Sequence, residues 1–206
     1  RNLPCLISLT LIRLSPSVFT VFRVGCVCPL LSANMRERET MPQVDSAIPR
    51  HEHPLDVIER LASHRAWNFD RDAEDEIAIS VTGRWAEYHV AFTWLADMEA
   101  LHVSCAFDLK VPDARRAETM ALVAAINERM WIGHFDVWSK DHVVMFRHAL
   151  LLAGGVQPNS SQCDALLNVA LDSCDKHFQA FQFVVWAGRP AHEALDAAMF
   201  ETVGEA

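Results

Sequence analysis

The sequence feature that most constrains the fold is a strict alternation of apolar and small or polar residues on both sides of a short acidic turn. Residues 89–110 read HVAFTWLADMEALHVSCAFDLK. Successive side chains of a strand point to opposite faces, so this alternation predicts two strands that each bury one face. The turn predicts an antiparallel hairpin in which Trp94 pairs with Leu101. A shift by one residue would move every apolar side chain to the solvent side, so the pattern also predicts the register.

Similar patterns predict the remaining elements. Strands are expected over 67–72 (a strand or a loop), 76–82, 87–94, 101–110, 133–141 and 142–152. Helices are expected over about eleven residues from Pro54, from Pro112 to about Met130, from Asn159 to Trp186 and from Arg189 to about Phe200. Asn159 and Gln162 are expected to form a capping pair for the long helix. This order predicts an α+β fold of two layers, with an antiparallel sheet of about five to six strands and helices packed on one face.

The N-terminal part of the chain differs from the rest. Its apolar residues have no steady period, and Arg13 and Arg23 divide them into pieces too short to cross a bilayer. We interpret it as a non-native or disordered extension, with Met35 or Met41 as the true start. A cryptic export or anchoring segment and an ordered extension remain as alternatives for residues 1–34. The expected organisation is an extension over 1–40, a linker over 41–53 and a domain over 54–206.

Charge and cysteine usage exclude several classes of function. The net charge of −9 argues against a nucleic-acid partner, because phosphate binding needs clustered Lys and Arg. We expect no membrane partner either. Cys163 and Cys174 are expected about 16 Å apart on one helix, too far for a disulfide. This fits a reducing compartment, and we expect a cytoplasmic protein. No CxxC or zinc-binding spacing occurs, so we expect no metal and no cofactor.

The residues that could carry chemistry each have a simpler structural explanation. His89 and His102 should share one face of the hairpin but stand about 13 Å apart, too far to share a metal. Cys105 has apolar neighbours and is expected in the core rather than as a nucleophile. We interpret HEHP, residues 51–54, as a solvated linker and Glu74–Glu76 as a solvated acidic turn. We therefore expect no catalytic residues.

The tryptophans invite a different interpretation, as a platform on which bases would stack. Trp94 belongs to the expected inward set, and Trp131 and Trp186 lie among apolar neighbours near helix ends. Basic residues do not alternate with them, as a nucleic-acid platform would require. We therefore expect these three tryptophans in the core.

One face of the first sheet stands out because its side chains are small and mostly uncharged. Ordinary solvated faces favour Lys, Glu and Arg, whereas a weakly polar face of low relief can accept another subunit or an extended client segment. Plain solvent exposure remains the alternative. The expected protein-binding face comprises Ala78, Ser80, Thr82, Ala91, Thr93, Ser104 and Ala106, together with Val144 and Phe146 of the strand that is apolar on both sides.

Arg147 and His148 interrupt this last strand and are the other candidates for recognition. An arginine in such a place is commonly paired with a carboxylate, for which Asp136 is the expected partner. A residue that recognises a partner and a small-ligand pocket are the alternatives.

Three further segments carry a resemblance to a known family. These are MWIGHFDVW (130–138), VVMFRHALLLAGG (143–155) and FQFVVWAGRPAHEALDAAMFETVGEA (181–206). They resemble the YbjN family of bacterial proteins, and the resemblance extends over about residues 50–206. It implies a sensory-transduction regulator with a fold similar to that of dimeric type III secretion chaperones. It supplies no catalytic residues.

The sequence thus favours a non-enzymatic regulatory or chaperone-like protein that acts by protein–protein binding, with protein clients or with itself as a homodimer. A small-ligand binder or an enzyme with a pocket near Arg147 and His148 is the alternative. A third hypothesis is an envelope-associated protein anchored through residues 1–34.

Overall fold

The computed structural model describes residues 52–203. The interpretations of residues 1–40, and of the linker up to residue 51, lie outside the described residues. The elements follow one another as α1 (Pro54–His64), β1 (Asn68–Ala73), β2 (Glu76–Thr82), β3 (Glu87–Leu95), η2 (Ala96–Met98), β4 (Ala100–Lys110), α2 (Asp113–Asn127), β5 (His134–Trp138), β6 (Val143–Leu151), α3 (Ser160–Val185) and α4 (Ala191–Val203).

The six described strands form one antiparallel sheet in the order β1-β2-β3-β4-β6-β5. The predicted hairpin is confirmed, because Trp94 pairs with Leu101 in the register that the alternation requires. β6 lies between β4 and β5 and is therefore an interior strand, as its two apolar sides indicate. The predicted α+β fold with an antiparallel sheet of five to six strands is confirmed.

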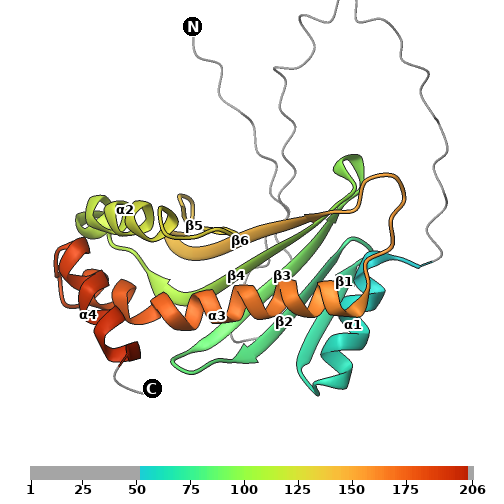
Figure 1. Cartoon of the computed structure of the whole chain (residues 1–206), viewed down its shortest axis with the longest axis horizontal. Helices are drawn as coiled ribbons and strands as arrows, with labels where there is room; N and C mark the ends of the chain where they lie inside the picture. Colours follow the sequence, from blue (N-terminus) through green and yellow to red (C-terminus); the bar gives the residue numbers. More distant parts are fainter. Residues whose placement is uncertain (1–51, 204–206) are drawn as a thin grey trace, which may run out of the picture. The chain divides into compact units, whose positions relative to one another are not determined.

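The helices pack on one face of this sheet (Figure 1). α3 packs on β4 and β6, α1 on β1, β2 and β3, and α2 on β5 beside α3 and α4. The inward side chains of the strands form the core with them. The ring centroid of Phe107 of β4, for example, lies 5.1 Å from that of Phe178 and 5.7 Å from that of Phe181, both of α3. Among the described residues, no helix packs on the opposite face, which we call the outer face.

Local hydrogen bonds explain where several helices begin and end. Asn159 and Gln162 form the predicted capping box at the start of α3. α2 ends at Asn127, earlier than the predicted Met130, because the Asn127 side chain bonds the backbone of β5. Its Nδ2 donates to the Phe135 carbonyl at 3.0 Å, and its Oδ1 accepts from the Phe135 N–H at 2.8 Å. This clamp holds the turn between α2 and β5.

The tryptophans divide between core and surface. Trp94 is buried, as predicted. The prediction that Trp131 and Trp186 lie in the core is wrong, because Trp131 is 100% exposed and Trp186 is 65% exposed. The early end of α2 leaves Trp131 in the connection between α2 and β5. Trp186 is the C-cap of α3, one residue beyond the buried pair Val184 and Val185.

None of the helices within residues 52–203 combines the length and the apolar character needed to span a membrane.

Candidate functional site

The outer face of the sheet carries the small residues that the sequence analysis selected. Cross-strand pairing places them side by side, with Ala78 beside Ala91 and Ala91 beside Ser104. Their side chains are exposed or half-buried, whereas the alternate residues of the same strands are buried in the core. The set on this face comprises Ala78, Ser80, Thr82, Ala91, Thr93, Ser104 and Ala106.

Pairing across all six strands arranges this face in rows that run perpendicular to the strands. The central row is Asp70, Ala78, Ala91, Ser104, Arg147 and His134. The row beside it, which we call the methionine row, is Asn68, Ser80, His89, Ala106, Met145 and Asp136. Small side chains thus occupy the middle of the central row, and its long and charged side chains lie toward the margins, whereas His89 stands among the small residues of the methionine row.

Val144 and Phe146 do not belong to this face. Both are fully buried, at 0% exposure, and pair with Val137 and Phe135 on the helix side of the sheet. The prediction that they contact a partner is therefore corrected. The strand is apolar on both sides because its inward residues enter the core while Met145 lies half-buried on the outer face.

The described central row contains two basic residues, Arg147 and His134. Arg147 forms an ion pair with a carboxylate. Its Nη1 lies 3.8 Å from Oδ2 of Asp136, which confirms the expected ion pair. Its Nε donates to Nε2 of His102 at 3.4 Å. His102 therefore accepts at Nε2 and is uncharged. Burial, and next to it the positive charge of Arg147, lowers the pKa of His102 to about 4.

His89 is a second histidine of the outer face, and it stands beside Ala106 as predicted. Burial lowers its pKa, against the opposing effect of Glu87 and Asp108. At neutral pH the middle of the outer face therefore carries less positive charge than its histidines suggest.

Arg147 and His148 do not converge on one pocket. They are neighbours in a strand, so their side chains point to opposite faces. Arg147 pairs with Ser104 on the outer face, whereas His148 pairs with Val103, which is buried on the helix side. Burial lowers the pKa of His148. Within the described residues, no three or more His, Cys, Asp or Glu side chains are placed to hold a metal ion.

Two contacts of α3 escaped the sequence analysis. Cys105 is buried, as predicted, but its Sγ lies 3.4 Å from Sγ of Cys174. Burial raises the pKa of the Cys174 thiol, which makes it a poor nucleophile. The Tyr88 hydroxyl donates to Oδ1 of Asp175 at 2.5 Å, and the Arg84 N–H donates to the same oxygen at 2.9 Å. These contacts tie α3 to the sheet rather than form a reactive site.

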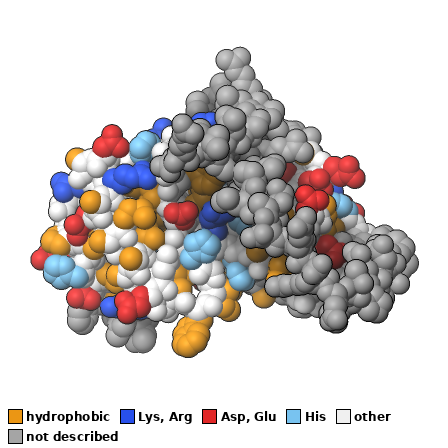
Figure 2. All heavy atoms as spheres, turned by 90° about the horizontal axis from the view of Figure 1, so that it is seen from above, with side chains coloured by type: hydrophobic (Ala, Val, Ile, Leu, Met, Phe, Trp, Pro, Cys, Tyr) orange, Lys and Arg blue, Asp and Glu red, His pale blue; other side chains and the backbone are white. Residues whose placement is uncertain are grey.

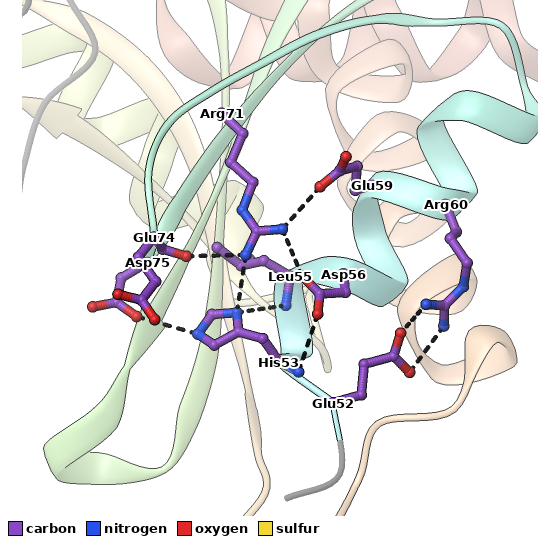
Figure 3. A network of polar contacts seen from close by, with 9 residues as sticks. All are labelled: Glu52, His53, Leu55, Asp56, Glu59, Arg60, Arg71, Glu74 and Asp75. Carbon is purple, nitrogen blue, oxygen red and sulfur yellow. Dashed lines mark hydrogen bonds and ion pairs between the residues drawn. The ribbon is translucent and has the colours of Figure 1, made fainter.

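A polar network at the start of α1 also departs from the sequence analysis (Figure 3). The expected solvated linker ends in a half-buried His53 whose Nδ1 accepts from the Leu55 N–H at 3.3 Å and so caps the helix. Its Nε2 lies 3.2 Å from Oδ1 of Asp75, a residue of the expected solvated acidic turn. Arg71 of β1 donates to Asp56 at 2.6 Å and to Glu59 at 2.8 Å. The network joins α1 to the sheet edge, and its ion pairs are structural.

Replacing Arg71 with methionine should lower the free energy of unfolding at pH 7 by at most about 1 kcal/mol, because its carboxylate partners are partly exposed. The hydrogen bond from Arg71 is the main cause of the lowered pKa of Asp56. A lowered pKa stabilises the fold above the unfolded value of about 4, and this stabilisation is lost as the pH falls through the folded value. The difference between wild type and Arg71→Met should therefore shrink below about pH 4 in urea titrations.

The control for this prediction is Arg60→Met. Arg60 is more exposed and pairs with Glu52 on the same side of the domain. Its replacement should leave the urea midpoint almost unchanged. A loss for Arg71→Met that is the same at pH 3 and pH 7 would show that its packing matters rather than its charge.

Comparison with known proteins identifies the family. Residues 54–183 match the family model of YbjN, described as "Putative bacterial sensory transduction regulator". The chain belongs to the YbjN family. A similar solved structure is the crystal structure of YbjN, "a putative transcription regulator" from E. coli, with 10% sequence identity and a TM-score of 0.44; the match covers 71% of this chain and 93% of that one. No curated protein matches the sequence.

Membership of the YbjN family agrees with the resemblance noted in the sequence. The matched residues include β1 to β6, and thus every row of the outer face. The family description is that of a regulator, and a regulatory role fits it.

Proposed function

We propose that this YbjN family member is a cytoplasmic, non-enzymatic, chaperone-like regulator that binds other protein chains through the outer face of its sheet and that forms a homodimer. One observation carries the proposal: small, weakly polar side chains occupy the middle of the central row, on a sheet face on which no described helix packs. Ala78, Ala91 and Ser104 lie side by side there. Such side chains offer little steric resistance and cost little desolvation when a partner covers them.

The distribution of charge supports the same proposal. The centres of protein interfaces are depleted of charged residues, and their rims are polar. In the central row, the charged Asp70 and Arg147 lie on either side of three small residues. Figure 2 shows one face of the molecule, on whose coloured part acidic, basic and histidine side chains are interspersed with uncharged ones rather than gathered by sign. This pattern suits a protein partner better than a polyanion.

The cysteines support the proposed compartment. Cys105 and Cys174 are free although their sulfur atoms are 3.4 Å apart. Thiols so close together persist most readily where the surroundings are reducing, as in the cytoplasm.

The alternative, a small-ligand binder at Arg147, has one observation in its favour: Arg147, His102 and Asp136 form a half-buried polar cluster. An anionic ligand would compete with Asp136 for the guanidinium, and His148 points to the other face. Protein binding therefore remains the function that the geometry supports best.

The test is affinity capture from native extract with the full chain as bait. The double variant Ser80→Arg, Ser104→Arg puts two positive charges on the outer face. We expect its affinity for a specific partner to fall at least about tenfold, which corresponds to about 1.4 kcal/mol of binding free energy. Circular dichroism should show that the variant is folded.

The matched control adds the same two charges elsewhere. Ala114 and Ala121 are exposed on α2, and Ala114→Arg, Ala121→Arg should retain the partner. Capture that is indifferent to the arginines on the outer face would remove this face from the proposal. Loss of capture in both variants would show a general effect of charge.

A further inference from the structure

Large and small side chains are distributed unevenly on the two sides of the midline of the outer face, which lies between β3 and β4. On the β2 side, the side chains at two matching positions are the small Ala78 and Ser80. On the β6 side, the matching positions of the same two rows carry the long Arg147 and Met145. Because the strand order is β1-β2-β3-β4-β6-β5, β2 and β6 are equally far from this midline.

This distribution makes the face complementary to a second copy of itself. Two copies that pack face to face are related by a twofold axis lying between the sheets. If the axis is parallel to the strands, it places β3 over β4 of the second copy and β2 over β6, and each row lies over its counterpart. Ala78 then faces Arg147 of the second copy, and Ser80 faces its Met145. Each long side chain meets a short one.

The charges at the margins agree with the same orientation. In the central row, Asp70 of β1 then faces His134 of the second copy. In the methionine row, the uncharged Asn68 faces Asp136. Carboxylates therefore meet groups that can donate hydrogen bonds to them.

The other limiting orientation is unfavourable. In this orientation the twofold axis lies in the plane between the two sheets, perpendicular to the strands and over the central row. It lays β6 over β6 of the second copy and β1 over β1. Arg147 would then approach Arg147 of the second copy, and Asp70 would approach Asp70. Like charges brought together at an interface cost free energy, and the long side chains of β6 would collide. Charge and bulk thus both favour the axis parallel to the strands.

The size and the protonation of the face are also suitable. The six strands are about 4.8 Å apart and range from five residues in β5 to eleven in β4, so the face offers about 750 Å² per copy. This is close to the roughly 800 Å² per partner that an interface of standard size buries. Sheets pack face to face at about 10 Å with their strands nearly aligned. The lowered pKa values of His89 and His102 leave both side chains uncharged at neutral pH, which reduces the cost of covering them.

We infer that two copies of this chain associate outer face to outer face about a twofold axis parallel to β3 and β4. The inference rests on the proposed function, because it names the partner of the proposed surface. Ala91 and Ser104 lie closest to the axis, so Ala91 of each copy faces Ser104 of the other. A client that binds the outer face must therefore displace the second copy. Only the monomer exposes this face, so the fraction of protein that is monomeric determines how many binding sites are open to the client.

Cross-linking of paired cysteines tests the orientation in the full chain, with Cys5, Cys26 and Cys28 replaced by serine. Ser80→Cys, Met145→Cys places one thiol on each side of the midline. Within one copy these positions are three strands apart, about 14 Å. A bismaleimide shorter than this separation should convert most of the double variant into a covalent dimer on a denaturing gel. Neither single variant should be converted.

Two further pairs make the orientation falsifiable. Ser80→Cys, Ala149→Cys uses the same two strands but positions in different rows, and it should give little dimer. Met145→Cys, Ala149→Cys reports on the perpendicular axis, which lays the methionine row over the row that contains Ala149. Covalent dimer from this pair, in place of the Ser80 and Met145 pair, would overturn the inferred orientation.

Sedimentation of the unmodified chain over a hundredfold range of concentration keeps the test decisive if a cysteine variant fails to fold. We expect the unmodified chain to form a dimer, and we expect Ser80→Arg, Ser104→Arg to lower its association constant at least about tenfold. A monomer throughout, or a dimer unaffected by these arginines, would overturn the inference. If affinity capture of a partner is still lost in the same arginine variant, the proposed function stands although the self-association fails.

Discussion

Replacing Phe107 with alanine should lower the free energy of unfolding by about 3–5 kcal/mol, the range for a fully buried Phe. Phe107 lies on β4, one of the two middle strands, and its side chain is almost fully buried. Its ring centroid lies 6.2 Å from that of Tyr88 of β3, in addition to the two α3 rings. Truncation would leave a cavity between the sheet and α3 that aromatic rings on three sides cannot fill. Urea titration followed by circular dichroism, at one fixed protein concentration, measures the loss.

Phe69→Ala is the matched control. Phe69 is on the edge strand β1, also points to the helix side, and is 37% exposed. Its truncation removes the same atoms but leaves no closed cavity, so we expect about 1 kcal/mol or less. Equal losses for the two variants would contradict the central place of Phe107 in the core.

The parts of the fold that were predictable from the sequence are those decided by local periodicity. Alternation over 89–110 predicted the β3–β4 hairpin and its register, and it selected the small residues of the outer face before their surroundings were known. Capping chemistry likewise predicted the start of α3 at Asn159. These signals depend only on which side chains lie next to each other along the chain.

Contacts between elements far apart in the sequence were not predictable in this way. The helical pattern of α3 shows which of its sides is apolar, but it does not show where the helix lies along the sheet. That position brings Cys174 against Cys105 and Asp175 against Tyr88. The burial of Val144 and Phe146 depends on the same placement.

The rows of the outer face depend on strand order for a similar reason. The hairpin of β5 and β6 was predictable, and with it the approach of Asp136 to Arg147. The two apolar sides of β6 indicated an interior strand, but the register of its pairing with β4 was not predictable, because α2 intervenes between them in the chain. Pairing of β6 with β4 is what puts Ser104 beside Arg147 and makes the two halves of the face complementary.

The exposure of Trp131 shows how one side chain can shift a boundary. Apolar residues continue along the sequence to Ile132, so the helical pattern extends past the true end of α2. The Asn127 side chain bonds β5 instead, and the chain leaves the helix there. Hydrogen bonds to a strand outweigh the propensity of the next residues to continue a helix.

Gly133→Ala should lower the free energy of unfolding by about 2–5 kcal/mol, from two causes that act together. Gly133 has a φ of +70°, where any side chain costs about 1–2 kcal/mol. In addition, a Cβ there would overlap the Phe146 ring and lie 3.0 Å from the Arg147 carbonyl oxygen. Phe146 is fully buried against Phe135, at 5.7 Å between centroids, and cannot move aside. Overpacking of this kind adds about 1–3 kcal/mol.

Gly154→Ala separates the two causes. Gly154 has a similar φ of +78°, but no atom lies within 4 Å of the position its Cβ would take. It should therefore lose only the backbone contribution of about 1–2 kcal/mol, and the difference between the variants measures the collision with Phe146. Equal losses in urea titrations would mean that the core near Gly133 yields. Because Gly133 immediately precedes β5, relief of the collision would displace His134 and Asp136 at the margin of the outer face. Folded Gly133→Ala protein should then also dimerise more weakly than Gly154→Ala protein in sedimentation, which links the packing under this turn to the proposed interface.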